Sequence, residues 1–392
     1  MKKLLLIVVD ALASRVLISA MQSGKLPNIS ALAKAGSLSN ECSAIFPSIT
    51  PAATSSLVTG CYPRDHGIPG AFWYDDEKGD VAYYGSDLWV IVNEGINTFF
   101  EDFLIHLNQQ KLKVETLFQT VERAGLQAGC LNYIIFHGDV RHRVDVPLVL
   151  DVIPGVPSKE DIYGPSILYL GDFVGAARET DHEAVHRFGI HKAAKVFKDR
   201  ARAGMFDRFG MEDDYTARTL IHLAQRRALP DFTVAYFPDN DFQSHEVGPH
   251  AAVTVLESFD TKLGELFAVY GRLEKMLQEL CIVITGDHSQ SDVQPDEEEA
   301  GIRLDELLKH FHLVDPGTLW DADDELMVCP NMGAAQIYFR DPRPESIKRV
   351  IWRLLDDPRV DQIIWRAEFT EGNVPGYRIV THRRGSLHFW AG

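Results

Sequence analysis

Leu-Leu-Leu-Ile-Val-Val-Asp, at residues 4–10, is the stretch that decides the fold. Its six apolar residues follow one another without alternation, which is typical of a strand covered on both faces in a parallel sheet. Similar apolar runs recur at 128–135, 232–237 and 281–285. We therefore expect these four segments to be strands of one buried sheet.

Helical patterns separate the apolar runs and lie at 27–34, 115–124 and 253–269. The first two are followed by a glycine, Gly36 and Gly125, as helices commonly are. A chain that alternates strands with helices predicts an α/β fold with a mostly parallel central sheet flanked by helices. In such sheets, functional residues gather in loops just beyond the carboxyl ends of the strands.

Two segments interrupt this alternation, one at about 72–114 and one at about 138–228. The second mixes proline, glycine and charged residues without a clear period. The first is rich in aromatic residues, namely Phe72, Trp73, Tyr74, Tyr83, Tyr84, Trp89, Phe99, Phe100 and Phe103. We expect a single domain over residues 1–392, with the first segment inserted as an aromatic cap and the second as a further insertion.

The charge balance excludes some partners. The 56 acidic residues exceed the 39 Lys and Arg residues, which gives a net charge of −17 at pH 7. An acidic surface of this size repels nucleic acid and anionic membranes unless basic residues are concentrated locally, and the sequence holds no such concentration. We therefore expect no nucleic-acid polymer and no membrane among the partners, but a small-molecule substrate.

The cysteines and the N-terminal residues indicate the cellular compartment in which the protein is expected. Five cysteines form an odd number without a Cys-x-x-Cys pair, so a disulfide framework is not expected. The apolar run after Met-Lys-Lys ends at Asp10 and is shorter than the roughly 7–15 residues of a secretory signal. No other segment approaches the roughly 20 apolar residues of a membrane span. These features predict a reduced, cytoplasmic protein.

Two motifs near the N-terminus place a carboxylate at the end of a strand and a hydroxyl at the start of a helix. Asp10 follows the first strand, where an aspartate can bind a ligand or simply cap the next helix. Thr50 precedes Pro51, which suits the first helical position, so we expect Thr50 to be the helix cap. A hydroxyl there lies among free backbone N–H groups and is placed to attack a phosphorus centre whose oxygens these groups hold.

Two later motifs add imidazoles. Asp241 and His245, four residues apart after the strand at 232–237, can converge on one metal ion, although Asp239 competes with Asp241 for this role. Asp287 and His288 follow the strand at 281–285. Carboxylates and imidazoles without cysteine favour zinc, with manganese or iron as alternatives. Together the motifs predict two divalent cations.

These motifs, in this order, resemble the alkaline phosphatase superfamily and, within it, the type I phosphodiesterase / nucleotide pyrophosphatase family. The resemblance implies an alkaline-phosphatase-like α/β core. It also implies a ligand set: one metal bound by Asp10, Asp287 and His288, and the other by Asp241 and His245.

The same resemblance assigns Thr50, in Phe-Pro-x-x-Thr, as the nucleophile and a metal ligand. The segment 59–68 matches a second family signature, in which His66 supports the loop rather than binding metal.

Three positions depart from the family pattern. The late Gly-x-His-Gly segment that completes the second metal site is absent, and His388 is the nearest substitute, with His382 as the alternate. Ala71 stands where the family has an asparagine that steadies a phosphate oxygen. Ser289 follows Asp-His where the family has glycine.

The predicted function is a metal-dependent phosphodiesterase or nucleotide pyrophosphatase that acts through a phosphothreonine intermediate. Trp73 and Tyr74 of the aromatic cap are candidates for stacking on a flat leaving group, the alternative being that they pack a small subdomain. A phosphomonoesterase, a phosphonate hydrolase and a catalytically degenerate binding protein remain alternatives. A sulfatase is excluded because residues 61–65 lack the arginine of Cys-x-Pro-x-Arg, and P-loop and GxGxxG motifs are absent.

Overall fold

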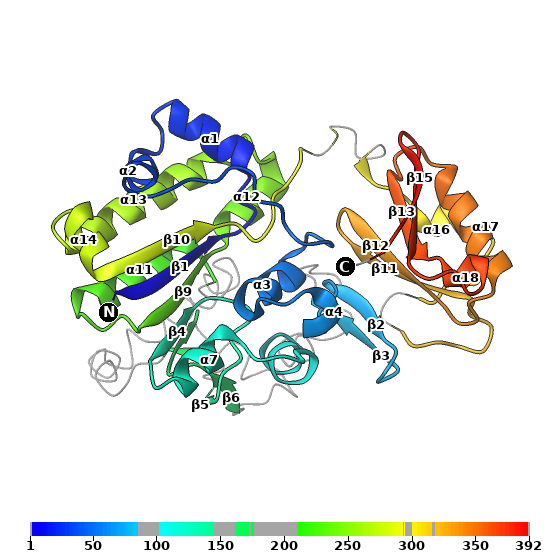
Figure 1. The fold of residues 1–392 in the computed structure, drawn as a ribbon, viewed down its shortest axis with the longest axis horizontal. Helices are drawn as coiled ribbons and strands as arrows, with labels where there is room; N and C mark the ends of the chain where they lie inside the picture. Colours follow the sequence, from blue (N-terminus) through cyan, green and yellow to red (C-terminus); the bar gives the residue numbers. More distant parts are fainter. Residues whose placement is uncertain are drawn as a thin grey trace, which may run out of the picture. The chain divides into compact units, whose positions relative to one another are not determined.

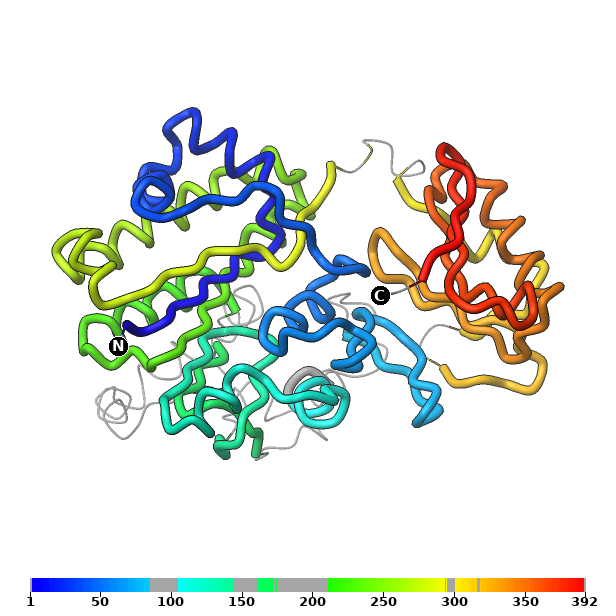
Figure 2. Tube along the Cα trace, viewed as in Figure 1, coloured from blue at the N-terminus to red at the C-terminus, as the bar shows by residue number. Residues whose placement is uncertain are grey.

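The computed structural model describes residues 2–84, 102–143, 161–171, 174–175, 211–292, 294, 300–315 and 318–390. The chain divides into two compact units, where the sequence predicts one domain. Unit 1 comprises Met1–Ala71 and Ser86–Asp292, and unit 2 comprises Phe72–Gly85 and Val293–Gly392. Figures 1 and 2 show the path of the chain through each.

The centre of unit 1 is a six-stranded sheet with the order β10-β1-β9-β4-β7-β8. The first five strands run parallel to one another, and β8 is antiparallel to β7. The strands are β1 (Lys3–Val9), β4 (Ala128–Leu131), β7 (Ile167–Leu170), β8 (Val174–Gly175), β9 (Phe232–Phe237) and β10 (Leu280–Thr285). The predicted mostly parallel α/β sheet is therefore confirmed.

Unit 1 contains nine helices among its described residues. They are α1 (Ser14–Gln22), α2 (Pro27–Ala35), α3 (Thr50–Thr59), α4 (Pro63–His66), α7 (Leu117–Arg123), α11 (Asp213–Gln225), α12 (Asp239–Val247), α13 (Val253–Val269) and α14 (Leu273–Glu279). A π-helix (Asp102–Lys111) and a short antiparallel pair, β5 (Val140–Arg143) and β6 (Asp161–Gly164), complete the unit. The three helices predicted from the sequence correspond to α2, α7 and α13.

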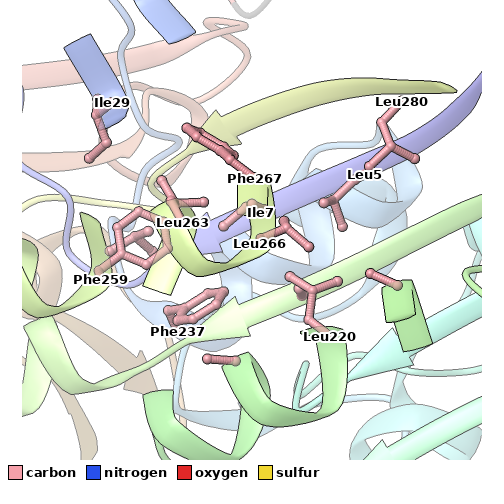
Figure 3. Packing of buried hydrophobic residues seen from close by; sticks show 14 of the residues in the cluster. Leu5, Ile7, Ile29, Leu220, Phe237, Phe259, Leu263, Leu266, Phe267 and Leu280 are labelled. Atoms are coloured by element: carbon pink, nitrogen blue, oxygen red, sulfur yellow. The ribbon is translucent and has the colours of Figure 1, made fainter. Parts of the chain in front are cut away.

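Helices cover both faces of the sheet, which explains the unbroken apolar runs. On one face, α1, α2, α11 and α13 pack against alternate residues of β1 and β9, including Ile7 and Phe237. Phe259 of α13 meets Phe237 edge-on with ring centroids 4.7 Å apart, and Figure 3 shows Leu263 and Leu266 of the same helix in this cluster. On the other face, Phe118 of α7 contacts the ring of Phe232.

A buried aspartate fixes α2 against α13. Asp260 lies in α13 and is 2% exposed. Its carboxylate accepts hydrogen bonds from the backbone N–H groups of Asn28 and Ile29, at 3.1 and 2.7 Å. These are unpaired donors of the first turn of α2, so Asp260 caps a helix that is distant in sequence.

The predicted insertion at 138–228 is in part a component of the core. Its described residues include β7, a strand of the central sheet, and α11, which packs on that sheet. The four residues of β7 are too few to give a clear period, and this is why the sequence pattern does not reveal the strand. Residues 144–160, 172–173 and 176–210 of the insertion lie outside the described residues.

Unit 2 contains three small antiparallel sheets and three helices among its described residues. The sheets are β2 (Phe72–Asp75) with β3 (Asp80–Tyr83), β11 (Leu326–Asn331) with β12 (Ala334–Phe339), and β13 (Gln362–Arg366) with β14 (Tyr377–Thr381) and β15 (Gly385–Phe389). The helices are α16 (Leu304–Leu307), α17 (Pro344–Leu355) and α18 (Glu368–Glu371). No described helix of the chain is both long enough and apolar enough to cross a bilayer.

The start of the predicted aromatic cap belongs to unit 2. The side chain of Asn331 accepts from the backbone N–H of Phe72 and donates to its carbonyl, at 3.1 and 2.7 Å. Phe72 also packs with Met327 and Cys329. This pair of hydrogen bonds joins segments 259 residues apart, which no local pattern shows. Residues 85–101 of the cap, with Trp89, Phe99 and Phe100, lie outside the described residues.

His66, at the end of α4, links this helix to α3. Its Nδ1 accepts from the backbone N–H of Ile68 at 3.2 Å, so Nε2 carries the proton and donates to Ser56 Oγ of α3, 3.0 Å away. The side chain is fully buried. Because burial disfavours the charged form, the pKa of His66 falls from 6.5 to about 4.

We expect a pH-dependent stability from this histidine. Below pH 6.5 the unfolded chain binds a proton at His66 that the folded chain does not bind until about pH 4. The free energy of unfolding should therefore fall by up to about 3 kcal/mol between these pH values. His66→Asn keeps an acceptor for Ile68 but does not titrate, so denaturant unfolding should show the stability gap between the two proteins shrinking as pH falls. A constant gap would contradict this assignment.

Candidate active site

Three acidic residues meet at one edge of the sheet of unit 1. Asp10 follows β1, Asp241 lies in the first turn of α12 after β9, and Asp287 follows β10. Because β1 lies between β9 and β10 and all three are parallel, their carboxyl ends share this edge. The topology thus brings together residues that are up to 277 positions apart.

Asp10, Asp287 and His288 form the one group of metal-ligating side chains within coordination range among the described residues. The Nε2 atom of His288 lies 3.4 Å from Asp10 Oδ1 and 3.9 Å from Asp287 Oδ2. All three side chains are at most 8% exposed. Within the described part of the chain, neither of these two carboxylate oxygens has a hydrogen-bond partner.

This group fits a divalent cation. Burial, together with the nearby charges of Asp287 and Asp241, raises the pKa of Asp10 well above its ordinary value, and burial also raises the pKa of Asp287. A cation among the unpartnered oxygens and the imidazole would favour the charged carboxylates. Two carboxylate oxygens and one imidazole nitrogen are a ligand set that zinc accepts, with a fourth position open to substrate.

The other oxygen of each carboxylate is bound. Asp287 Oδ1 accepts from the backbone N–H groups of Ala11 and His288, at 3.2 and 2.8 Å. Asp10 Oδ2 accepts from the hydroxyl of Tyr236, a buried residue of β9. Burial raises the pKa of Tyr236 well above its ordinary value, so this hydroxyl remains a donor. The loop after β1 is held as well, because Asn240 Nδ2 donates to the carbonyl of Asp10 at 2.7 Å.

Thr50 stands next to this group. Its Oγ1 lies 3.0 Å from Nε2 of His288. The predicted helix cap is wrong by one residue, because α3 begins at Thr50 itself and Ile49 takes the cap position without a side-chain hydrogen bond. The hydroxyl of Thr50 is directed to His288 instead of to a backbone N–H group. It is therefore available at the positive end of α3 as a nucleophile.

Neighbouring hydroxyls have other partners. Thr54 Oγ1 and Ser55 Oγ donate to the carbonyls of Thr50 and Pro51, one turn earlier in α3. Ser48 Oγ donates to the carbonyl of Ile45. Of these candidates, the geometry favours Thr50.

Asp241 and His245 form the second pair of predicted ligands. They lie one turn apart on α12, with Asp241 Oδ2 3.4 Å from His245 Nε2. The hydrogen bond with Asp241 raises the pKa of His245. The other oxygen of Asp241 accepts from Gln290 Nε2.

Asp239, the competing candidate, has a structural role. The carboxylate of Asp239 accepts from the backbone N–H of Asp213 at 3.2 Å. In return, the backbone N–H of Asp239 donates to the carboxylate of Asp213 at 3.0 Å. Asp239 thus caps the start of α11 rather than facing Asp10.

Ala71 has a packing role where the family places a polar side chain. It is 8% exposed and lies in a small apolar cluster with Ile49 and Ala52, at the start of α3. A methyl group at this position cannot bind a phosphate oxygen. It does support the turn that presents Thr50.

The remaining predicted residues lie in unit 2. Trp73 is 3% exposed, with its ring 5.3 Å from that of Tyr84. The ring of Tyr74 meets Trp320 and Tyr338 edge-on, at 5.8 and 5.7 Å. These contacts match the alternative that the aromatics pack a subdomain, and their contact with substrate stays a prediction.

The two late histidines are also in unit 2. His388 Nε2 donates to the carbonyl of Pro375 at 2.7 Å, and its ring lies 4.7 Å from that of Trp390. His382 is exposed in the turn between β14 and β15. The metal group described above includes neither residue, so the third ligand of the second site stays a prediction.

Sequence reasoning missed three residues that hold the ligands, namely Tyr236, Asn240 and Gln290. A tyrosine in a fully buried strand such as β9 must find a partner for its hydroxyl, and this was the available signal for Tyr236. Asn240 and Gln290 adjoin ligand motifs but carry no pattern of their own.

The chain is similar to known proteins in sequence and in fold. The family model for type I phosphodiesterase / nucleotide pyrophosphatase matches residues 4–368. Murine ectonucleotide pyrophosphatase / phosphodiesterase 5, solved as an inactive variant in complex with AMP, is 14% identical, with a TM-score of 0.54 over 100% of this chain and 84% of that chain. The human protein is 16% identical, with a TM-score of 0.54 over 97% and 78% of the two chains. No curated protein sequence matches significantly.

We expect purified chain to carry about two divalent cations when no chelator is used, zinc being favoured. Asp287→Asn keeps acceptors for Ala11 and His288 but removes the charge at Oδ2, so it should lose one cation. Elemental analysis of both proteins provides the measurement. Fewer than one ion per unsubstituted chain, with no uptake of added zinc or manganese, would refute the metal assignment.

Proposed function

Because the chain belongs to the type I phosphodiesterase / nucleotide pyrophosphatase family and is a hydrolase of phosphodiester bonds, we propose that it acts with two divalent cations and a phosphothreonine intermediate at Thr50. The observation that carries the proposal is the position of Thr50 Oγ1, 3.0 Å from an imidazole of the buried metal-ligating group. Sequence and geometry thus point to the same hydroxyl.

The residues divide between two cation sites. Asp10, Asp287 and His288 would hold the first cation, and Asp241 and His245 would hold the second. When bound, the cations lower the pKa of the attacking hydroxyl and neutralise charge on the phosphate oxygens and the leaving group. Zinc is the proposed metal, with manganese and iron as alternatives, since the donors are carboxylates and imidazoles.

Thr50 carries the covalent chemistry. Its Oγ1 forms a bond to phosphorus while the bond to the departing ester oxygen breaks, and the hydroxyl proton passes to solvent as the bond forms. The N-terminal N–H groups of α3 face the transferred phosphoryl oxygens and stabilise their charge. Water then attacks the phosphothreonine, which regenerates the hydroxyl and releases a phosphate monoester.

We propose a nucleoside or aryl phosphodiester as the substrate. A phosphomonoester carries a second negative charge, and monoesterases hold it with additional cationic side chains. Arg64, the arginine nearest to Thr50 in sequence, is exposed on α4, and the side chain of Arg15 donates to the backbone carbonyl of Gln290. A diester, with a single charge, requires less compensation. The complex of AMP with a murine relative agrees with a nucleotide substrate.

Substitution of the nucleophile tests the proposal. Thr50→Ala should keep the fold and both cations but reduce turnover by several powers of ten, because the methyl group offers no nucleophile. Acid quench of the unsubstituted enzyme during turnover of a phosphodiester, followed by mass spectrometry, should find the phosphoryl group and its remaining ester group bound covalently to Thr50. Thr54→Ala is the matched control, since it removes a nearby threonine hydroxyl of the same helix. Retention of more than about a tenth of the activity by Thr50→Ala would redirect the assignment to Ser48 or Thr54.

A comparison of ester classes tests the substrate. We expect a higher kcat/KM for bis(p-nitrophenyl) phosphate than for p-nitrophenyl phosphate at saturating zinc, and turnover of an aryl phosphonate monoester, which also carries a single charge. With a p-nitrophenyl ester as the phosphonate, all three substrates release the same leaving group and differ only in the charge and the other substituent on phosphorus. A preference for the phosphomonoester would place the chain with the phosphatases of the superfamily.

A further inference from the structure

Each of the three carboxylates at the site has one oxygen bound by a neutral donor, and its other oxygen lies beside an imidazole of a candidate metal ligand, His288 for Asp10 and Asp287 and His245 for Asp241. Backbone N–H groups bind Asp287 Oδ1, the Tyr236 hydroxyl binds Asp10 Oδ2, and the Gln290 amide binds Asp241 Oδ1. The opposite oxygens of Asp10 and Asp287 have no partner within the described residues. The opposite oxygen of Asp241 faces His245.

From this arrangement we infer that Tyr236 and Gln290 are positioning residues, each for a different cation: Tyr236 selects the oxygen of Asp10 that binds the first cation, and Gln290 selects the oxygen of Asp241 that binds the second. This inference rests on the two-cation function proposed above. Neither residue touches the reacting atoms, and each acts through a carboxylate.

Neutral donors suit this role for an electrostatic reason. An arginine or lysine in either position would compete with the cation for the negative charge, whereas a hydroxyl or amide fixes the orientation and leaves that charge in place. A carboxylate with one oxygen bound also loses less rotational freedom when the cation arrives. Partners of this kind typically contribute 10–100-fold in metal affinity.

The two donors are anchored independently of each other. Tyr236 is 3% exposed in β9, with its ring edge-on to Tyr133 at a centroid distance of 5.6 Å. Gln290 is half-buried in the loop after β10, where its backbone carbonyl accepts from the side chain of Arg15. Their effects on the two sites should therefore be separable.

Single-site backgrounds allow this separation. His245→Ala removes a ligand of the second cation and leaves the first site intact, and Asp287→Asn does the reverse. In each background, calorimetric titration of the metal-free chain with zinc chloride measures one dissociation constant. Tyr236→Phe should raise this constant 10–100-fold in the His245→Ala background and leave it unchanged in the Asp287→Asn background. Gln290→Leu should give the opposite pattern.

Two control variants match the substitutions in chemistry and location. Tyr133→Phe removes a buried hydroxyl that donates to the carbonyl of Thr54, so it should leave both zinc constants unchanged. Gln243→Leu removes an amide on α12 that contacts Glu246 rather than a ligand. Excess zinc should restore the turnover of Tyr236→Phe, which a purely structural defect would not allow.

Equal effects of Tyr236→Phe in both backgrounds, or none in either, would overturn the role of Tyr236, and the same criterion applies to Gln290→Leu. Because Gln290 is half-buried, its substitution carries the test even if the Tyr236 variant does not fold. If the unsubstituted chain takes up no zinc, manganese or iron, the two-cation function fails and this inference with it. If the unsubstituted chain binds two cations but Tyr236→Phe and Gln290→Leu leave the zinc dissociation constants unchanged, the proposed function stands and this inference alone is overturned.

Discussion

The burial of three acidic side chains at one edge of the sheet is the constraint on which the site depends. The order β10-β1-β9 forces Asp287, Asp10 and Asp241 together, because the carboxyl ends of adjacent parallel strands coincide. Burial and mutual repulsion raise the pKa of Asp10, so the charged site is costly by itself. A bound cation removes this cost. It follows that a bound cation would stabilise the folded chain at this edge, because the candidate ligands are brought together only by folding.

The position of Thr50, the proposed nucleophile, follows from packing around α3 rather than from the candidate metal ligands. Tyr133 donates to the carbonyl of Thr54, His66 bonds to Ser56, and Ala71 packs against Ile49 and Ala52. These contacts hold the helix from the sheet side, from the following helix and at its first turn. Thr50 therefore reaches His288 from a rigid element, which is the condition for placing a nucleophile in line with a leaving group.

Sequence reasoning identified the part of the fold whose signals are local. β1 and β9 were predicted because both faces are buried and leave continuous apolar runs, and α13 because one face is apolar. The grouping of the candidate ligands Asp10, Asp287 and His288 was predicted because strand ends converge. The division into two units was not predicted, because Phe72 joins unit 2 through a hydrogen bond to Asn331, which lies far along the chain. Tyr236 and Gln290 escaped because their role exists only once β1, β9 and β10 are adjacent.

The two proposed cation sites differ in a way that bears on how the enzyme acquires its metals. The side chain of His288 is 8% exposed, whereas that of His245 is 47% exposed. The first site has three protein ligands from two adjacent strand ends, while the second has two from a single helix and a third that the described geometry does not supply. A cation with fewer protein ligands and more water exchanges more readily. The affinity of the second site for its cation therefore depends strongly on the hydrogen bond from Gln290 to Asp241. This bond gains importance because the family's late histidine is missing from this site.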